Sequence, residues 1–420
     1  MRKATYRMYP STAQFEALDT LLGLHQRVYN SALEARINAY KATGKGPGFA
    51  KQCKALTQWR HRVPALKAVN AQSLQVTLKR LSLAYAAFFR RVAEGAEQPG
   101  FPRFKSLRRF SGWGYKTHGD GWTLHAGEAM RHGYVRLAGV GNVKLRGQPR
   151  TAGSPTTAEV LHKDGRWYLS VTLECTPARQ HGARAIGLDW GLKHFATTLD
   201  DTGSANKIAN PRFQDREHLQ RIKTLQQAVA RKLDKRSHRR RRAVARLSRA
   251  CSKIARQRKD FLHKESAWIV AGSALIETEE LNIAGMTATG GAYKHGLNRS
   301  ILDTAPSRFL ALLHSKAEEA GCAWCWVPTR KVKPTQTCSH CGTVAGPRGR
   351  EEMDVRTWTC PACHTVHDRD VNSAAVALNW ALTGSATGQE LKREPPARVS
   401  CRAGSGSGFT VSNRETPSVA

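Results

Sequence analysis

The chain has 420 residues, which is long enough for two or three domains, each with its own hydrophobic core. It carries 67 Lys and Arg against 32 Asp and Glu, a formal net charge of +35. This excess predicts a nucleic-acid partner, because basic side chains that neutralise phosphates release condensed counterions.

Membrane and secreted classes are excluded by the apolar patterning. The longest apolar run, Ala267 to Ile276, is too short to span a bilayer, and the start MRKATYRMYPSTAQ lacks the apolar stretch of a signal peptide. We therefore expect no membrane partner and a cytoplasmic protein that is nucleoid-associated when bound to DNA. In that reducing compartment, the 10 cysteines favour metal ligation or burial over disulfides.

The amino-terminal part is predicted to contain one strand followed by helices. Residues 1–9 alternate in polarity, and Ser11 with Gln14 forms the capping-box pattern that begins a helix. Apolar side chains at helical spacing predict a second helix over 70–91.

The segment GFPRFK at 100–105 closes this helical part. It interleaves aromatic and basic residues, which suits a base or sugar contact beside a phosphate contact. A structural turn with a buried Phe is the alternative. The candidate nucleic-acid contacts here are Phe101, Arg103 and Lys105.

The middle of the chain changes to β character and then to alternating α and β. Residues 113–175 predict a small barrel or sheet, with a hairpin turn at 163–165. Residues 182–184 resemble a linker, and 185–382 predict an α/β region. The Gly, Ser and Pro-rich residues 384–420 predict a disordered tail.

Acidic residues interrupt three apolar elements of the α/β region. Asp189 lies in the strand AIGLDWG, a second group ends the strand ALIETEEL, and a third opens the Ala-rich helix HDRDVNSAA. Two divalent ions can bridge such carboxylates and promote attack of water on a phosphodiester, and oxygen ligands favour Mg²⁺ or Mn²⁺. Helix capping is the alternative for the third group. The candidates of the last two groups are Glu277, Glu279, Glu280, Asp368 and Asp370.

Two CxxC pairs predict a structural Zn²⁺ site. Cys338 and Cys341 form the first pair, Cys360 and Cys363 the second, and 18 residues separate the pairs. The CAWC segment at 322–325 has the same spacing, but it lies in a strand-like run where residues i and i+3 point to opposite faces. We expect those two cysteines in the core.

A strongly basic stretch occupies residues 231–264, which contain 15 Lys and Arg but only two Asp. Its partial helical periodicity predicts a pair of helices along a nucleic-acid backbone, and a solvated charged surface is the alternative. The candidate contacts are Arg239, Arg240, Arg241, Arg242, Arg246 and Arg249.

Several motifs resemble the TnpB family of transposon-associated RNA-guided nucleases, which are related to compact type V CRISPR effectors. The motifs are YRMYPSTAQ at the start, GFPRFK, GLDWGLKHFA, ETEELNIAGM, and TCSHCG followed by DVRTWTCPACHTVHDRDVNSAA. The resemblance covers residues 1–380 and implies that Asp189, Glu279 and Asp370 are the catalytic RuvC metal ligands. It also implies two partners, a guide RNA and a target double-stranded DNA.

The resemblance further implies a multidomain α/β fold with an RNase H-like (RuvC) core, a zinc-ribbon insert, a helical recognition lobe and a small β-barrel wedge domain. Residues 1–10 would start the wedge, 11–112 form the recognition domain and 113–181 complete the wedge. The RuvC core would span 185–330, with the basic helical segment 212–264. The zinc ribbon at 331–366 would bind target nucleic acid, and 367–383 would complete RuvC.

Two segments depart from the family pattern. Pro306, in LDTAPS, is expected to disturb a helix start, and Lys331 to Pro334 replaces the usual Ser before the first CxxC pair. Two other functions stay open: a nuclease-inactive RNA-guided repressor and a guide-independent transposase. The three acids favour the nuclease, and a monomer is the expected state.

Overall fold

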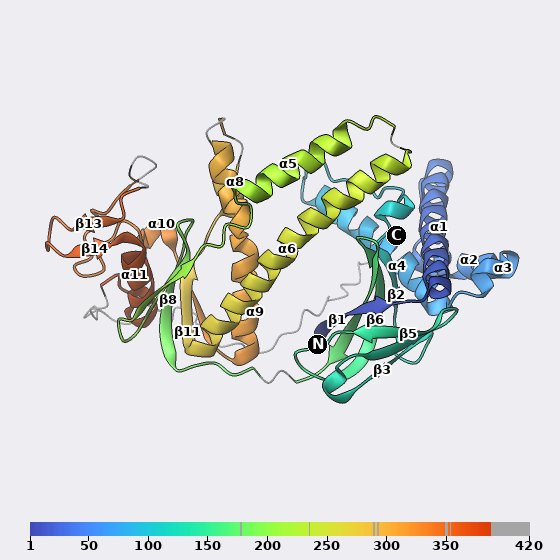
Figure 1. Ribbon diagram of the computed structural model, residues 1–420, viewed down its shortest axis with the longest axis horizontal. Helices are drawn as coiled ribbons and strands as arrows, with labels where there is room; N and C mark the ends of the chain where they lie inside the picture. The colour runs from blue at the N-terminus through green and yellow to red at the C-terminus, as the bar shows by residue number, and fades with distance from the viewer. Residues whose placement is uncertain are drawn as a thin grey trace, which may run out of the picture. The chain divides into compact units, whose positions relative to one another are not determined.

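Figure 1 shows the computed structural model, which describes residues 1–387 except for 177–178, 235, 289, 292–293, 349–351 and 353. The chain divides into two compact units, Met1–Pro177 and Ala178–Ala420. Among the described residues, none of the helices combines the length and the apolar character of a membrane span. Residues 388–420, most of the predicted tail, lie outside the described part.

The first unit is built on a seven-stranded antiparallel sheet with the order β2-β6-β7-β1-β5-β4-β3. The amino-terminal strand belongs to the same sheet as the later strands, because β1 pairs with both β5 and β7. Hydrogen bonding among the described residues leaves β2 and β3 at the edges, so the sheet is open rather than a closed barrel. The strands are β1 (Arg2–Tyr9), β2 (Gly112–Tyr115), β3 (Trp122–Ala126), β4 (Gly133–Leu137), β5 (Gly141–Arg146), β6 (Ser154–Lys163) and β7 (Arg166–Glu174).

Helices of the first unit bury one side of this sheet. Leu18 and Leu22 of α1 and Leu74 of α4 join Trp113 and Trp167 in one hydrophobic core. The helices are α1 (Thr12–Thr43), α2 (Phe49–Arg62), α3 (Pro64–Lys67) and α4 (Ala71–Ala93), with 3-10 turns at η1 (Leu107–Arg109) and η2 (Glu128–Met130).

Local sequence signals of the first unit are confirmed. The Ser11 side chain accepts from the Gln14 backbone and the Gln14 side chain accepts from the Ser11 backbone, which completes the capping box. Asp164 and Gly165 form the two-residue turn between β6 and β7 with φ of 53° and 71°, as a type I′ hairpin requires.

The second unit is built on a five-stranded mixed sheet with the order β10-β9-β8-β11-β12. Strand β9 runs antiparallel to both β8 and β10, whereas β11 runs parallel to both β8 and β12. The strands are β8 (Arg184–Trp190), β9 (His194–Asp200), β10 (Ala205–Ala209), β11 (Ser273–Glu279) and β12 (Ala323–Val327).

Seven helices and a small hairpin complete the described part of the second unit. The helices are α5 (Arg216–Ala230), α6 (His238–Gly272), α7 (Ile283–Met286), α8 (Lys294–Thr304), α9 (Pro306–Ala320), α10 (Thr329–Val332) and α11 (Arg369–Thr383). The hairpin is β13 (Thr357–Thr359) with β14 (Val366–Asp368). The buried residues Phe195, Leu262, Ile276, Phe309 and Leu313 form the main core.

The predicted basic segment 212–264 contains α5 and most of α6, and α6 continues beyond it to Gly272 with Ile269 and Val270 buried. One expectation for this unit needs correction. Pro306 does not disturb a helix but begins α9, where its missing N–H is harmless, and Ala305 adopts a left-handed conformation just before it. Cys322 and Cys325 are both buried, as expected.

Candidate active site and zinc site

Two adjacent strands carry the first two acids. In the parallel pairing of β8 and β11, Leu188 lies opposite Thr278, so Asp189 and Glu279 are the next residues of their strands. Both strands end at this point, and their carboxyl ends meet at one edge of the sheet.

Helix α11 supplies the third acid. Asp368 caps this helix, because its carboxylate accepts hydrogen bonds from the backbone N–H groups of Asp370 and Val371. The same carboxylate forms an ion pair with Lys207 of β10 at 2.6 Å. Asp370 is free of that capping role and lies 3.5 Å from Arg356 Nη1. The capping alternative therefore applies to Asp368 and not to Asp370.

A serine joins the acids of the sheet to the helix. Ser373 follows Asp370 by one helical turn, and its hydroxyl lies 3.1 Å from Asp189 Oδ1 and 3.5 Å from Glu279 Oε1. The hydroxyl donates to either carboxylate. The sequence signal for Ser373 is its i+3 spacing from Asp370, which places both on one face of a helix.

Close approach of α11 to the sheet depends on Gly187, two residues before Asp189. A Cβ atom at Gly187 would lie 2.0 Å from the backbone oxygen of Ala374 and 2.9 Å from Leu378 Cβ. The bare backbone at this position therefore lets α11 lie against β8 and brings Ser373 within reach of both carboxylates.

We expect Ser373→Ala to weaken divalent-metal binding at the acids by roughly 10- to 100-fold, because groups that orient metal ligands have effects of this size. Mn²⁺ binding followed by electron paramagnetic resonance, together with the Mg²⁺ dependence of DNA cleavage, measures the change. Ser373→Thr keeps the hydroxyl and is expected to recover most of the affinity. Unchanged Mn²⁺ binding in Ser373→Ala would contradict the orienting role.

The acids influence one another electrostatically. Burial, followed by the negative charges of Glu279 and Asp370, raises the pKa of Asp189 well above its ordinary value. Burial also raises the pKa of Glu279, while the Ser373 hydroxyl acts in the opposite direction. Closely spaced carboxylates of this kind gain from a cation that neutralises them, and hard oxygen donors suit Mg²⁺ or Mn²⁺.

Neighbouring acids have different environments. Glu277, on the same strand face as Glu279 but fully buried, has its pKa raised to about 9 by desolvation, so it is neutral at pH 7. Glu280 follows β11 and is exposed. The structure thus brings Glu279, rather than either neighbour, to Ser373 and Asp189.

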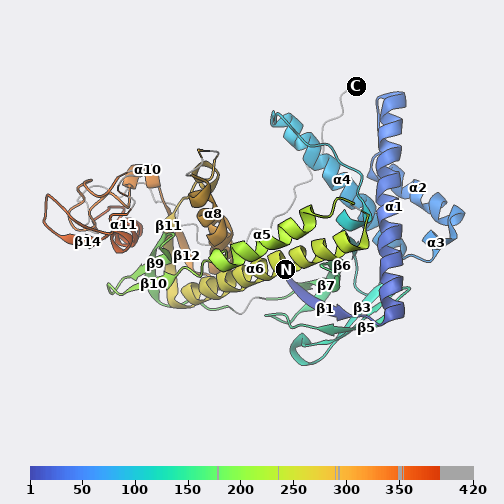
Figure 2. The same cartoon turned by 45° about the horizontal axis from the view of Figure 1, so that its top comes forward.

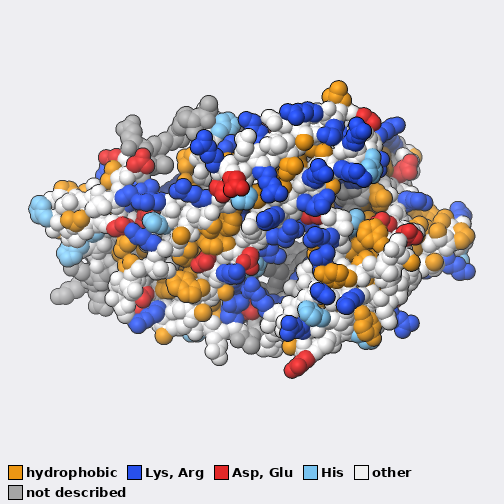
Figure 3. All heavy atoms as spheres, in the orientation of Figure 1, with side chains coloured by type: hydrophobic (Ala, Val, Ile, Leu, Met, Phe, Trp, Pro, Cys, Tyr) orange, Lys and Arg blue, Asp and Glu red, His pale blue; other side chains and the backbone are white. Residues whose placement is uncertain are grey.

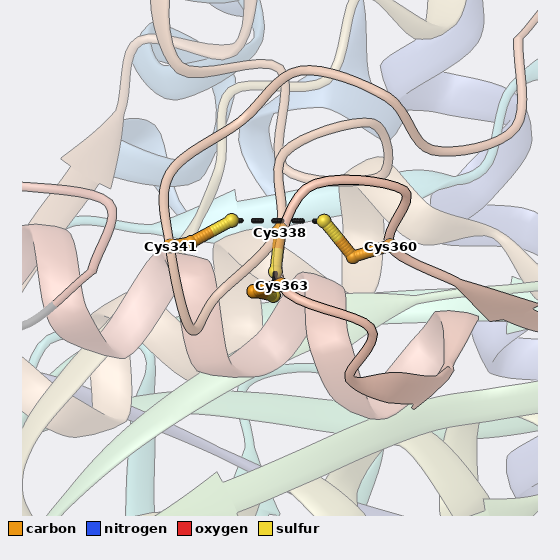
Figure 4. Close-up of side chains that lie close together, drawn as sticks. All are labelled: Cys338, Cys341, Cys360 and Cys363. Atoms are coloured by element: carbon orange, nitrogen blue, oxygen red, sulfur yellow. Dashed lines mark hydrogen bonds between the residues drawn. The ribbon is translucent and has the colours of Figure 1, made fainter.

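The four predicted zinc cysteines converge (Figure 4). Their Sγ atoms all lie within 4.8 Å of one another, and the Cys338–Cys363 and Cys341–Cys360 pairs are each 3.6 Å apart. Zn–S bonds of about 2.3 Å at tetrahedral angles place sulfur atoms about 3.8 Å apart, so the cluster fits zinc. Among the residues described, this is the only group of three or more potential metal ligands found to converge in this way.

The two CxxC turns have matching backbones. The N–H of Gly342 donates to the oxygen of Cys338, and that of His364 donates to the oxygen of Cys360, both at 2.9 Å. Gly342 and His364 have φ of 77° and 56°, so each turn reverses through a left-handed residue. This repeated geometry aims both sulfur pairs at one point.

Hydrogen bonds prepare the two less buried thiols for ligation. Hydrogen bonding with Thr343 lowers the pKa of Cys341 to about 6, and Thr365 lowers the pKa of Cys363 in the same way. Burial raises the pKa of Cys338 to about 12, and His367 Nε2 lies 3.0 Å from its sulfur.

The cysteine cluster is tied directly to α11. The buried Asn372 accepts from the backbone N–H of Ser339 at 2.9 Å and donates to the backbone oxygen of Thr337 at 2.7 Å. Asn372 lies between Asp370 and Ser373 in sequence. Movement of the first cysteine turn therefore moves the helix that carries the third acid.

Helices α5 and α6 pack side by side and antiparallel, and we refer to residues 216–272 as the α5–α6 arm (Figure 2). Lys and Arg side chains gather over this arm on the face seen in Figure 3. A groove of about 230 Å³ runs between the helices, and its basic lining is Lys232, Arg239, Arg242 and Arg246.

The six arginines predicted in this arm differ in role. Arg239, Arg241, Arg242, Arg246 and Arg249 are exposed. Arg240 instead donates to the backbone oxygens of Val229 and Lys232, at 2.9 Å and 2.5 Å, and so closes the turn between α5 and α6. The sequence run of four arginines gave no sign of this difference.

The base of the arm is fixed by an ion pair. Asp303 of α8 is buried, pairs with Arg258 of α6 at 2.5 Å and accepts from the backbone N–H of Gln214 at 3.0 Å. Asp303 belongs to the segment LDTAPS that departs from the family pattern. Its observed role is to hold the arm to the core.

Arg242→Ala is expected to lower the log–log salt slope of duplex DNA binding by about 0.9, the value for one phosphate contact. Arg240→Ala should leave this slope unchanged and lower the melting temperature instead, because its hydrogen bonds are internal. Fluorescence anisotropy at several salt concentrations measures the slopes. Equal slopes for wild type and Arg242→Ala would remove this arginine from the interface.

The GFPRFK segment is a structural turn with exposed side chains. Asn30 of α1 forms two hydrogen bonds with the Lys105 backbone, of 2.9 Å and 3.0 Å, and Phe101 packs edge-on against Tyr85 and Phe88 of α4. Phe101, Lys105 and Arg103 remain exposed. The local turn is therefore present, while nucleic-acid contact stays a prediction.

Three family models match parts of the chain. Residues 168–289 match OrfB_IS605, described as a probable transposase, and residues 307–376 match the Cas12f1-like TNB domain. Residues 1–45 match a model described as a helix-turn-helix domain, although they form the strand β1 and the single helix α1.

Relatives with curated names match almost the whole chain. A protein of Streptomyces pristinaespiralis named as an RNA-guided DNA endonuclease is 31% identical, covering 96% of this chain and 94% of its own length. InsQ of Escherichia coli (strain K12), named in the same way, is 26% identical over 95% of this chain and 98% of its length.

Solved structures of CRISPR effectors are more distant. A Cas12f1–sgRNA–target DNA complex matches with 14% identity and a TM-score of 0.33, covering 90% of this chain and 98% of that one. A CRISPR–Cas12f ternary complex matches with 14% identity and a TM-score of 0.36, covering 86% of this chain and 80% of that one. The near-complete match to the Streptomyces protein, rather than these distant structures, shows that the chain belongs to the TnpB family.

Proposed function

We propose that the protein is an RNA-guided DNA endonuclease, in which Asp189, Glu279 and Asp370 hold Mg²⁺ or Mn²⁺ for phosphodiester hydrolysis. The observation that carries this proposal is the contact of Ser373, one helical turn after Asp370 on α11, with Asp189 of β8 and Glu279 of β11. The curated names of the two relatives support the same activity. The partners are a guide RNA and a target double-stranded DNA.

The core is RNase H-like in this proposal. Its support is the strand order: numbered along the chain, the five strands lie as 3-2-1-4-5, with the first three antiparallel. Residues 185–330 and 367–383 form this RuvC core, and the zinc ribbon at 331–366 contacts target nucleic acid. Residues 11–112 act as the recognition domain, and 1–10 with 113–181 act as the wedge.

The acids have distinct tasks at the cutting step. Asp189, Glu279 and Asp370 would hold divalent ions, which would supply an activated water and stabilise the leaving oxygen of an in-line displacement. Asp189 and Glu279 provide rigid oxygen donors from the sheet. The Ser373 hydroxyl orients Asp189 Oδ1 or Glu279 Oε1, depending on which of the two it donates to. Asp370 completes the set from the helix, with Arg356 offsetting part of its charge.

The direct test of guidance is programmed cleavage. Protein purified with its RNA is expected to cut only plasmids that match the guide, and a guide of new sequence should redirect the cut. Removal of the RNA should abolish cutting even when Mg²⁺ is still present. Cutting that persists without RNA would favour the guide-independent transposase, and RNA binding without any cutting would favour the repressor.

A further inference from the structure

A lysine lies in line with the first two acids on one face of the five-stranded sheet. Glu279 of β11 and Asp189 of β8 are neighbours in the parallel pairing. Asp189 lies opposite Thr197 of β9, and Thr197 lies opposite Lys207 of β10. Directly paired residues point to the same face, and strands lie about 4.8 Å apart, so Lys207 is about 10 Å along this row from Asp189.

The row faces α11. Leu188, Ala196 and Ile208, at the alternate positions of β8, β9 and β10, are buried in the main core of the unit, which α9 shares. Gly187, on the same face as the acids, lies instead against the backbone of α11. The lysine therefore shares its face with the helix that carries the third acid.

The Lys207 ammonium binds the residue that caps α11. Its Nζ lies 2.6 Å from Asp368 Oδ2, while Asp368 Oδ1 accepts hydrogen bonds of 3.1 Å from the backbone N–H groups of Asp370 and Val371. The two oxygens of one carboxylate are thus divided between the strand and the helix. Two consecutive contacts join Lys207 to the backbone of Asp370.

Strand β10 is a firm support for this lysine. Asp200 Oδ1 accepts from the backbone N–H groups of Thr202 at 3.0 Å and Ser204 at 2.9 Å, which fixes the turn between β9 and β10. At the other end of β10, Asn210 Nδ2 donates to the backbone oxygen of Leu192 at 2.7 Å. These bonds hold both ends of the strand without involving α11.

The first turn of α11 is also tied to the segment before β13. The backbone N–H of Arg369 donates to the backbone oxygen of Arg356 at 2.8 Å, and Arg356 Nη1 lies 3.5 Å from Asp370 Oδ1. Asp370 is therefore placed between two anchors, Lys207 through Asp368 on one side and Arg356 on the other.

The ion pair itself contributes little to the stability of the fold. The side chains of Lys207 and Asp368 are 34% and 40% exposed, and exposed ion pairs add little to the free energy of folding. The consequence of losing Lys207 is thus expected in the position of Asp370 and not in whether the unit folds.

We propose that Lys207 is a positioning residue for DNA cleavage, which holds the first turn of α11 through Asp368 and so sets the position of Asp370. The inference rests on the proposed nuclease function, because it concerns the same metal site. Groups that orient metal ligands change metal affinity by roughly 10- to 100-fold, and Lys207 acts through one further residue, at the lower end of this range.

The test measures Mn²⁺ binding to the full-length protein by electron paramagnetic resonance, together with the Mg²⁺ dependence of guided cleavage. Lys207→Met is expected to weaken Mn²⁺ binding about 10-fold and to raise the Mg²⁺ concentration for half-maximal cleavage by a similar factor. The rate at saturating Mg²⁺ and the melting temperature should stay close to those of the wild type. Lys207→Arg keeps the charge and should recover most of the affinity. Unchanged Mn²⁺ binding in Lys207→Met would overturn the proposal.

Asp368 variants separate the ion pair from the helix cap. Asp368→Asn keeps a capping oxygen, because Asn caps helices about as well as Asp, but removes the charge that attracts Lys207. It should lose Mn²⁺ affinity to the same extent as Lys207→Met, and the double variant should lose no more than either single variant. Losses that multiply in the double variant would overturn the coupling of the two side chains.

Arg308→Met is the matched control for the lost charge. Arg308 is exposed on α9, which packs on the opposite face of the sheet. This variant should keep the wild-type Mn²⁺ affinity and Mg²⁺ dependence. An equal loss of affinity in Arg308→Met and Lys207→Met would show an effect of net charge and overturn the positioning role.

A direct contact with the DNA is the rival role for Lys207. In that case Lys207→Met would lower the log–log salt slope of duplex DNA binding by about 0.9 and leave Mn²⁺ affinity unchanged, which would overturn the positioning role. Wild-type protein that binds Mn²⁺ and cuts DNA, with an unaffected Lys207→Met variant, rejects only this inference. Wild-type protein without Mn²⁺ affinity would reject the metal site of the proposed function as well.

Discussion

Gly187→Ala is expected to abolish DNA cleavage and to destabilise the second unit by about 1–3 kcal/mol, the usual range for an overpacked site. The added methyl group would lie 2.0 Å from the backbone oxygen of Ala374, so α11 must move away from β8. That movement separates Ser373 and Asp370 from Asp189. Plasmid cleavage and thermal unfolding measure the two effects.

Gly296→Ala is the matched control, because Gly296 lies within α8 and a Cβ there meets no atom within 4 Å. This variant should keep full cleavage and gain up to about 1 kcal/mol of stability from better helix propensity. Cleavage at the wild-type rate in Gly187→Ala would show that the close approach of α11 is not needed.

Loss of the zinc cluster is expected to have the second large effect. Cys341→Ser should abolish zinc binding, unfold the β13–β14 hairpin and sharply reduce DNA cleavage. The reduction follows because Asn372 couples the first cysteine turn to the helix of Asp370. Structural zinc binding is worth about 10 kcal/mol or more, far beyond what this small hairpin can replace.

Metal analysis by mass spectrometry, with hydrogen exchange at residues 357–368, measures these changes. Cys251→Ser is the control, since Cys251 is exposed on α6 and away from the cluster in sequence. It should retain one zinc ion per chain. Retention of zinc and cleavage in Cys341→Ser would show that this cysteine is not a required ligand.

Short-range signals in the sequence predicted much of the structure. The capping box at Ser11, the hairpin turn at Asp164–Gly165 and the spacing of the CxxC pairs depend on neighbouring residues, and each is found as expected. The parallel pairing of β8 with β11 was harder to predict from the sequence, because 82 residues separate the end of β8 from the start of β11.

Contacts that depend on tertiary packing could not be predicted. In the sequence Ser373 is an ordinary polar helix residue, and its role follows from the carboxylates that β8 and β11 place beside it. Gly187 is needed because α11 lies against the sheet at this position, which the sequence does not show. Arg240 was grouped with its exposed neighbours, because composition alone does not show that its guanidinium closes a turn. The choice of Glu279 and Asp370 depended on family resemblance.

The most direct test of the account compares three near-isosteric variants, Asp189→Asn, Glu279→Gln and Asp370→Asn, with Glu280→Gln as a neighbouring exposed control. Guided plasmid cleavage in Mg²⁺ should vanish in the first three and persist in the control, with guide-RNA affinity the same in all. Wild-type cleavage by any of the three would contradict a shared metal site built from these acids.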